Sequence, residues 1–442
     1  MGQRRLSRRD FLRMSASAGA ALAVWPSIPK LNKLAATAAP SPAEATELTF
    51  WTFVAAHQDY YQKQVEGWNE ANPDRQIKLN AMTLPYDEMH DKLLIALQSG
   101  TGAPDIVDIE VAKFGLFLRG DIQLHDLTDM IDRHRDKLIL ARVALYSYGD
   151  KQYAIPTHLG AYIMFYNKEL TDSAGIDIES IKSWDDFIAA GKEFPNGKDD
   201  AWWTALETTD RHSYIGPTLQ NGGGVYDRDG NFIMDCQANV EVLQMFVDML
   251  KKDKIATLAP GGFFHDPAWY EYYNRGKVAA IWMPQWYMIR QEFLPDLAGK
   301  MRIRPMPLFA PNGYTSAMGG GTGTAITKQI NPDKLPLAKD FLEYAKLTYD
   351  ANLQIWNTFG FDPIRFDVYD DPALLGEMPY WGGEKPMLVI KQVARNIASE
   401  RLGPKYPEAM EVMRESLFID ALEGDVPPAE ALKKAAEAVQ LR

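Results

Sequence analysis

From Glu47 onward the chain alternates short β-prone runs with longer segments of helical periodicity, and this alternation constrains its fold more than any other feature. Apolar and aromatic side chains recur at helical spacing in the longer segments, and Pro73 ends the first of them. The first series is strand-like at 48–53, helical at 57–72, strand-like at 77–84, helical at 86–98 and strand-like at 106–110. Repeated β-α-β units predict a mainly parallel sheet with helices on both faces.

A second α/β series follows a region in which two strand-like pieces flank a turn at Gly149-Asp150 and lead into a β-prone run at 161–166. Its elements are a strand at 201–206, a helix at 239–252 and a strand at 278–283, and two further helices are predicted later in the chain, at 332–347 and 427–440. Asp229-Gly230 lies between two short apolar pairs and predicts a hairpin turn. The chain is long enough for two domains of ordinary size, so we expect two α/β lobes.

The first 45 residues have the features of an export signal. A twin-arginine pair, Arg8-Arg9, precedes Phe11-Leu12 and an apolar run at 14–24. That run is far shorter than the roughly 20 residues that a helix needs to cross a bilayer, so it predicts a twin-arginine signal peptide rather than an anchor. Cleavage patterns of small residues occur at 36–38 and 43–45, and the sequence does not choose between them.

Charge and cysteine content exclude several classes of protein. The formal net charge is −12, and removal of residues 1–45, which hold seven basic and two acidic residues, leaves −17. Such a surface repels nucleic acid and anionic membranes. The single cysteine, Cys236, cannot form an internal disulfide or hold an iron-sulfur cluster alone. We therefore expect no cofactor, no nucleic-acid partner and a monomeric, soluble product in the periplasm.

Residues 319–323, Gly-Gly-Gly-Thr-Gly, precede an apolar run. Glycines supply backbone freedom, which suits a segment that changes its dihedral angles when two lobes move. The alternative is a phosphate-binding loop, but the Lys-Ser/Thr ending of such a loop is absent and the glycine spacing of a dinucleotide site is not met. A hinge is the favoured interpretation.

Signatures of catalysis are weak. The seven histidines are too far apart in sequence for a local two-histidine metal motif, and no G-x-S-x-G nucleophile motif occurs. Asp105, Asp108 and Glu110 could supply paired carboxylates for glycoside hydrolysis. A secreted glycoside hydrolase that uses Glu110 and an exported cofactor enzyme therefore stay open as alternatives, with no catalytic or metal-binding residue assigned.

Aromatic side chains are abundant, with 11 tryptophans and 20 tyrosines. Flat rings offer apolar area on which the faces of sugar rings stack. The hydroxyl groups of the sugar then bind to carboxylate and amide side chains at the rim of the site. Core packing is the alternative for any single tryptophan, because tryptophan is highly buried on average. Rings after predicted strands favour a site, since α/β sheets bind ligands beyond the carboxyl ends of their strands.

Several motifs in their shared order resemble the family 1 extracellular solute-binding proteins of bacterial ABC importers, the group that includes maltose-binding protein. They are Ala103-Pro104-Asp105-Ile106-Val107, Tyr153-Ala154-Ile155-Pro156, Tyr166-Asn167-Lys168-Glu169-Leu170, Ser183-Trp184-Asp185-Asp186-Phe187, Gly276-Lys277-Val278-Ala279-Ala280, the glycine stretch before Ala325-Ile326-Thr327, and the final Ala431-Leu432 helix. The resemblance covers essentially all of residues 47–442. Many members carry a lipid anchor or a general secretory signal, whereas this chain carries a twin-arginine signal.

The resemblance implies a two-lobed α/β periplasmic-binding-protein fold with hinge crossings and a ligand cleft between the lobes. Lobe 1 would hold 46–156 and 324–360, lobe 2 would hold 163–317 and 366–442, and the crossings would lie near 156–162, 318–325 and 360–365. The ligand would be a sugar or oligosaccharide passed to the permease subunits of an ABC importer, although the family also captures other solutes such as glycerol phosphates. The expected ligand-binding residues are Trp51, His57, Glu110, His158, Trp203, Trp269, Trp286, Gly320 and Asp362.

Overall fold

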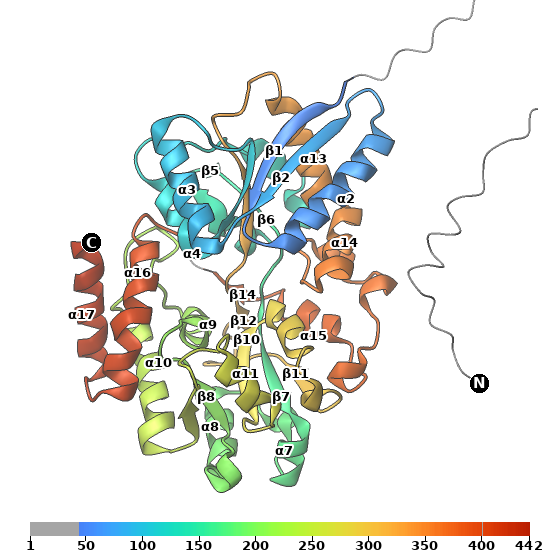
Figure 1. Cartoon of the computed structure of the whole chain (residues 1–442). Coiled ribbons are helices and arrows are strands. Elements are labelled where there is room, and N and C mark those ends of the chain that lie inside the picture. The colour runs from blue at the N-terminus through green and yellow to red at the C-terminus, as the bar shows by residue number, and fades with distance from the viewer. Residues whose placement is uncertain (1–43, 400) are drawn as a thin grey trace, which may run out of the picture. The chain divides into compact units, whose positions relative to one another are not determined.

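The computed structural model describes residues 44–399 and 401–442. The predicted twin-arginine pair and apolar run of the export signal lie outside these residues. The described chain gathers into two groups of elements, here called lobe 1 and lobe 2 (Figure 1). No helix among the described residues is both long and apolar enough to cross a membrane.

Lobe 1 is built on a five-stranded sheet in the order β2-β1-β3-β13-β6. Its strands are β1 (Thr46–Thr52), β2 (Ile77–Thr83), β3 (Ile106–Glu110), β6 (Ile155–Pro156) and β13 (Thr322–Ile326). Strand β1 pairs in parallel with β2 and β3, as the β-α-β pattern predicts. Strand β13 pairs antiparallel with both β3 and β6, because it belongs to a segment that re-enters lobe 1 after the chain has passed through lobe 2.

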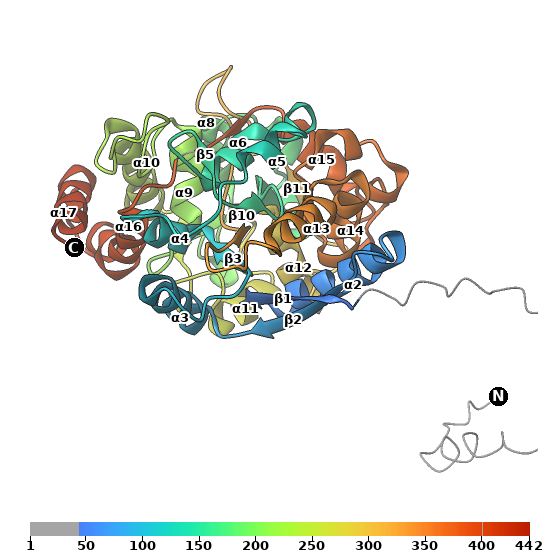
Figure 2. The same ribbon diagram turned by 90° about the horizontal axis from the view of Figure 1, so that it is seen from above.

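Four main helices cover this sheet: α2 (Ala55–Ala71), α3 (Tyr86–Ser99), α13 (Leu335–Leu347) and α14 (Tyr349–Phe359). Helix α13 lies beside α2 in both views (Figures 1 and 2) although about 270 residues separate them in sequence. The Tyr60 hydroxyl of α2 donates to the Ala345 carbonyl at 2.7 Å, and the two helices share an apolar core. Shorter elements complete the lobe: α4 (Val111–Phe114), α5 (Thr128–Asp132), α6 (Leu140–Val143), β4 (Ser147–Tyr148) and β5 (Lys151–Gln152).

Lobe 2 contains a three-stranded sheet in the order β10-β7-β11, formed by β7 (Tyr162–Asn167), β10 (Ala280–Pro284) and β11 (Met301–Arg304). Both pairings are antiparallel, so the parallel arrangement that the β-α-β pattern suggests does not extend to this sheet. The reason is that β7 enters the lobe from the crossing, whereas β10 ends beside the crossing at Pro284, opposite Tyr162. A separate parallel pair consists of β8 (Thr204–Leu206) and β9 (Ala256–Leu258).

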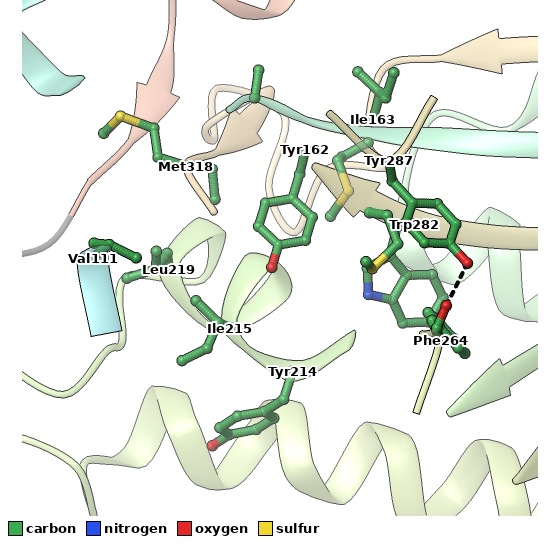
Figure 3. Packing of buried hydrophobic residues seen from close by; sticks show 14 of the residues in the cluster. Val111, Tyr162, Ile163, Tyr214, Ile215, Leu219, Phe264, Trp282, Tyr287 and Met318 are labelled. Atoms are coloured by element: carbon green, nitrogen blue, oxygen red, sulfur yellow. Dashed lines mark hydrogen bonds between the residues drawn. The ribbon is translucent and has the colours of Figure 1, made fainter. Parts of the chain in front are cut away.

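Helices surround the sheet of lobe 2 and bury a continuous aromatic and aliphatic core. They are α7 (Lys168–Ser173), α8 (Trp184–Glu193), α9 (His212–Gln220), α10 (Gln237–Val247), α11 (Pro267–Asn274), α12 (Met288–Gln291), α15 (Pro386–Val393), α16 (Tyr406–Val412) and α17 (Pro428–Leu441). Figure 3 shows Tyr162 pointing from the start of β7 toward Ile215 on α9. The Tyr162 hydroxyl donates to the His212 carbonyl at 2.9 Å, which ties this helix to the strand.

Local signals account for several boundaries. Ser183 caps α8 and forms a reciprocal capping box with Asp186, which satisfies two backbone donors that the helix itself leaves free. The hairpin predicted at Asp229-Gly230 is present, with Tyr226 and Phe232 bridged antiparallel. The helix predicted at 239–252 starts at Gln237 and continues beyond Val247 as a π-helical turn, Asp248–Lys252.

The segments predicted as crossings lie side by side. Leu159 N–H donates to the Asp362 carbonyl at 2.8 Å, and Gly319 N–H donates to the Gly160 carbonyl at 2.9 Å. Strand β12 (Ser316–Ala317) pairs in parallel with β14 (Ile397–Ala398), so a fourth stretch of chain joins them. Backbone hydrogen bonds therefore connect these segments to one another.

Candidate ligand-binding site

Glu110 stands at the end of β3, where the strand gives way to α4. Its carboxylate caps this helix by accepting the Ala112 N–H at 2.7 Å, and it also accepts the Tyr86 hydroxyl at 2.9 Å. Both interactions fix the side chain at the edge of lobe 1 that faces lobe 2. This is the strand-end position at which α/β sheets present polar groups to ligands.

Arg211 meets Glu110 from the other lobe. It directly precedes α9, and its Nη2 lies 3.6 Å from Glu110 Oε1, with both side chains only about an eighth exposed. Arg211 also pairs with Asp210 at 3.3 Å. Burial by itself would lower the pKa of Arg211, but the charges of Asp210 and Glu110 outweigh burial and raise it, so the guanidinium stays charged.

A pocket of about 410 Å³ opens beside this ion pair. Its walls come from lobe 1, from the segment before α9, and from α16 with the π-helical turn that follows it. The lining residues are Tyr86, Asp87, Ala112, Lys113, Thr209, Arg211, Pro407, Met410, Glu411, Arg414 and Glu415. The volume falls in the range of about 300–1,000 Å³ that is typical of small-molecule sites. Three basic and three acidic side chains line the pocket together with apolar residues, which suits a neutral ligand rich in hydroxyl groups.

Trp286 lies in the short helical turn Gln285–Tyr287 that follows β10, and it is partly exposed. Its ring stacks on His265 with centroids 5.6 Å apart and an interplanar angle of 15°, and the edge of His212 packs against it at 5.3 Å. The indole N–H donates to the Gly319 carbonyl at 3.0 Å, which ties the ring to the glycine crossing. Burial lowers the pKa of His265 to about 4 and that of His212 to about 3, so both imidazoles are neutral at physiological pH.

Gly320 has a φ of +61°, a conformation that favours glycine, and a Cβ at this position would lie 3.2 Å from the Trp286 Nε1. The next residue, Gly321, packs against His158, since a Cβ there would lie 3.2 Å from His158 Cε1, and its carbonyl accepts the N–H of Val111, the neighbour of Glu110, at 3.0 Å.

Asp362 ties the crossings together. Its two carboxylate oxygens accept the N–H groups of Gly160 and Ala161, each at 2.9 Å, and its own N–H donates to Gln285 Oε1. Burial raises the pKa of the carboxyl to about 7, against the opposing effect of the two amide donors. Asp362 is fully buried, so its carboxylate is not open to a ligand in this conformation.

Two of the expected residues lie within lobe 1. The His57 Nδ1 lies 2.9 Å from Asp108 Oδ2, and its ring packs on Phe359. Trp51 is 8% exposed on β1, and the Lys92 ammonium sits 4.5 Å from its ring centroid. Neither residue lines the pocket beside Glu110.

Trp203 and Trp269 lie in the core of lobe 2 with no exposed surface. Trp203 packs between Phe187 and Phe194, while Trp269 stacks on Phe264 at 4.3 Å and donates its indole N–H to the Tyr287 hydroxyl. In this conformation neither ring has a face available to a ligand. Both tryptophans therefore act as core residues here. The buried Trp203 Nε1 has no hydrogen-bond partner among the described residues.

None of the nine residues predicted from the sequence lines the pocket itself, although Glu110 pairs with Arg211 at its edge. Lys113 and Arg211 follow β3 and β8, so the same rule of strand ends that selects Glu110 could have found them. Met410 and Arg414 come from the last fifth of the chain and have no such signal. The described residues contain no group of three or more His, Cys, Asp or Glu side chains arranged to hold a metal ion.

Comparison with known proteins places the chain in a family. Residues 55–348 match the family model described as bacterial extracellular solute-binding protein. The chain is 44% identical over 400 residues to the arabinooligosaccharide-binding protein of Halalkalibacterium halodurans, which covers 90% of this chain and 89% of that protein. It is 39% identical to the protein of the same name from Bacillus subtilis, over 88% of this chain and 91% of the relative.

Solved structures of sugar-binding proteins share the fold. The cyclic α-maltosyl-1,6-maltose binding protein of Arthrobacter globiformis superimposes with a TM-score of 0.72 at 20% identity, over 90% of this chain and 99% of that one. This likeness extends across both lobes and agrees with the two-lobed α/β fold expected from the sequence. The chain belongs to the bacterial extracellular solute-binding protein family.

Proposed function

We propose that this protein captures an arabinooligosaccharide in the cleft between its lobes and delivers it unaltered to the permease subunits of an ABC importer. The observation that carries the proposal is the similarity to two arabinooligosaccharide-binding proteins, at 44% and 39% identity, along about nine tenths of both chains. Identity at this level over about nine tenths of both chains supports a shared ligand class.

The geometry supports a neutral, hydroxyl-rich ligand. Three cationic and three anionic side chains line the pocket: Lys113, Arg211 and Arg414, with Asp87, Glu411 and Glu415. Opposite charges balance there, so the pocket favours hydroxyls over phosphate. Trp286 would supply the apolar face on which a sugar ring stacks, with Glu110 and His158 as hydrogen-bonding partners and Gly320 as the backbone that allows close approach.

Capture would proceed by closure of the lobes. An open form admits the sugar, contacts from both lobes favour the closed form, and the importer recognises that form. The crossings at 156–162, 318–325 and 360–365 would act as the hinge, with lobe 1 at 46–156 and 324–360 and lobe 2 at 163–317 and 366–442. Asp362 would hold the crossings in register during this motion. We further propose export by the twin-arginine route to the periplasm, a monomeric state and no catalytic activity.

Thermal melting of the purified protein tests the ligand class. We expect arabinotriose to raise the melting temperature, because a ligand at 100 times its Kd stabilises the native state by about 2.7 kcal/mol. Maltotriose and glycerol 3-phosphate serve as controls and should cause no shift. Chromatography of the sugar afterwards should return it intact. A shift with glycerol 3-phosphate alone, or release of shorter sugars, would contradict the proposal.

A further inference from the structure

Arg142 on α6 is fully buried, and its guanidinium lies over the Tyr146 ring, with Cζ 5.8 Å from the ring centroid. Its Nε, Nη1 and Nη2 atoms are all enclosed, and none of them has a hydrogen-bond partner among the described residues. An arginine buried in this way is rare, because a guanidinium carries five N–H donors that water would otherwise satisfy. Leaving such donors unpaired costs the native state free energy.

His158 beside it shares this property. It is 3% exposed, and neither ring nitrogen has a hydrogen-bond partner in the described chain. The glycines of two crossings pack against both side chains. A Cβ on Gly160 would lie 3.7 Å from Arg142 Nη1 and from His158 Cδ2, and one on Gly321 would overlap the guanidinium. Burial and the neighbouring Arg142 charge hold the pKa of His158 well below its ordinary value, so the imidazole is neutral.

The location of the pair points to the ligand cleft. Gly321 follows Gly320, which packs on Trp286, and Gly321 accepts the N–H of Val111, the residue after Glu110. The pair therefore lies on the floor between the two proposed sugar contacts, where the lobes meet. The carboxylates of Asp362 and Glu110 lie close enough to favour the charged form of Arg142 electrostatically, yet neither accepts a hydrogen bond from it.

These observations define the chemistry that would satisfy the pair. The guanidinium needs oxygen atoms that accept its hydrogen bonds. The negative charges of Asp362 and Glu110 already compensate its positive charge, so a neutral acceptor is enough to satisfy its donors. The planar fork of a guanidinium matches two adjacent oxygens, and a neutral imidazole can donate to or accept from a third. Adjacent hydroxyl groups of a sugar ring have this arrangement.

We propose that Arg142 and His158 form a specificity-determining subsite at the floor of the cleft, which binds adjacent hydroxyl groups of one terminal sugar residue. This inference rests on the proposed function and extends it. Opening of the lobes would uncover the side of the pair that faces the cleft and let the long Arg142 side chain turn toward it, while Asp362 keeps the crossings together. Closure on a sugar then seals the guanidinium against ligand oxygens instead of leaving it unpaired.

The test compares Arg142→Met with the unaltered protein in two measurements. Arabinotriose affinity, by calorimetric titration, should fall by about 10- to 150-fold, the range for the loss of hydrogen bonds to a charged group. The melting temperature without sugar should rise by about 1–4 °C, because methionine removes an unpaired buried charge at similar volume. If Arg142 had only a structural role, its replacement would not lower the affinity and raise the melting temperature at the same time.

Arg304→Met is the matched control. Arg304 on β11 is a guanidinium paired with both Glu179 and Glu384, so its loss should lower the melting temperature and leave arabinotriose affinity unchanged. Arg142→Lys provides a second variant if Arg142→Met does not fold. It keeps the charge but loses the planar fork, and we expect a loss of affinity of about 5-fold or more.

The outcomes separate the two proposals. If the unaltered protein binds no arabinooligosaccharide, the proposed function fails. If it binds arabinotriose and both Arg142 variants bind equally well, the subsite is wrong while the function stands. A fall in both affinity and melting temperature for Arg142→Met would also overturn the subsite, because it would show that the guanidinium is satisfied within the folded chain.

Discussion

At the scale of single residues, lobe 1 contains a chain of buried polar groups that are paired with one another. Asp108 accepts the hydroxyls of Thr52 and Thr324 at 2.9 and 2.7 Å and contacts His57 at 2.9 Å. Lys346 on α13 is 1% exposed, and its ammonium donates to the Thr157 hydroxyl at 2.6 Å. This network links the sheet to the first crossing and makes the stability of the protein sensitive to pH.

The sign of that sensitivity follows from Lys346. Burial lowers its pKa from 10.5 to about 7, although the Asp108 charge opposes the change. Between these two values the unfolded chain binds the proton and the native protein does not, so the free energy of unfolding rises with pH. We expect the stability of the unaltered protein, relative to Lys346→Met, to increase from pH 7 to pH 10.

Denaturant unfolding at several pH values measures this difference. Lys339→Met, which removes a lysine of the same helix that pairs with Asp129 at 3.1 Å, should leave the pH dependence unchanged. If the difference in the free energy of unfolding between the unaltered protein and Lys346→Met does not change from pH 7 to pH 10, Lys346 stays protonated in the native state.

The burial of the tryptophans could not be predicted from residue type alone. The sequence selected Trp203, Trp269 and Trp286 by the same criterion, and the structure separates them. Trp203 and Trp269 have no exposed surface, whereas Trp286 is partly exposed beside the glycine crossing. Burial depends on which distant helices cover a ring, and a single sequence carries no local record of that.

At the scale of elements, most helices and strands agree with their sequence patterns to within a few residues. Helix α3 at Tyr86–Ser99 and strand β3 at Ile106–Glu110 match the predicted ranges of 86–98 and 106–110. Hydrophobic periodicity and proline positions act over a few residues, and so they can be read locally. The direction of β13 could not be read in this way, because it depends on the path of the chain through the other lobe.

Strand β13 also requires glycine for packing reasons. A Cβ on Gly323 would lie 2.6 Å from the Tyr146 ring, which is fully buried and donates its hydroxyl to the Gly321 carbonyl. Gly323→Ala should therefore destabilise the protein by about 1–3 kcal/mol, the usual cost of overpacking. Denaturant unfolding of the variant measures this loss.

Gly376→Ala is the control for that substitution. A Cβ on Gly376 meets no atom within 4 Å, so alanine there should be neutral or slightly stabilising. Equal stabilities for the two variants would mean that the Tyr146 ring moves aside at little cost, and that the glycine is not required by packing.

At the scale of the whole described unit, the Glu110–Arg211 pair joins the two lobes beside the pocket. It is mostly shielded from water, at 13% and 12% exposure, and so its interaction is screened less than that of a surface pair. Arg119 adds a second link from lobe 1, since it contacts both the Pro404 carbonyl and Glu408 of α16. Both contacts therefore join lobe 1 directly to lobe 2.

A double-mutant cycle tests whether the pair contributes to capture of the sugar. Glu110→Gln and Arg211→Met should each weaken arabinotriose binding, and the double variant should lose less than the sum, with a coupling of about 0.5–3 kcal/mol. The exposed pair Lys434–Asp420 serves as a control and should show no effect on affinity. Strictly additive losses would mean that the two side chains act on the ligand independently.

The sequence by itself determined the order of strands and helices and the two-lobed α/β class. These features depend on short-range periodicity, turn residues and glycine, and they were sufficient for the resemblance to the solute-binding family. Only the tertiary structure decided which polar groups meet. It brought Arg211 to Glu110, placed α16 against the pocket and enclosed Arg142 with His158. Such contacts join residues up to about 300 positions apart, and their energies depend on burial, which the sequence pattern does not contain.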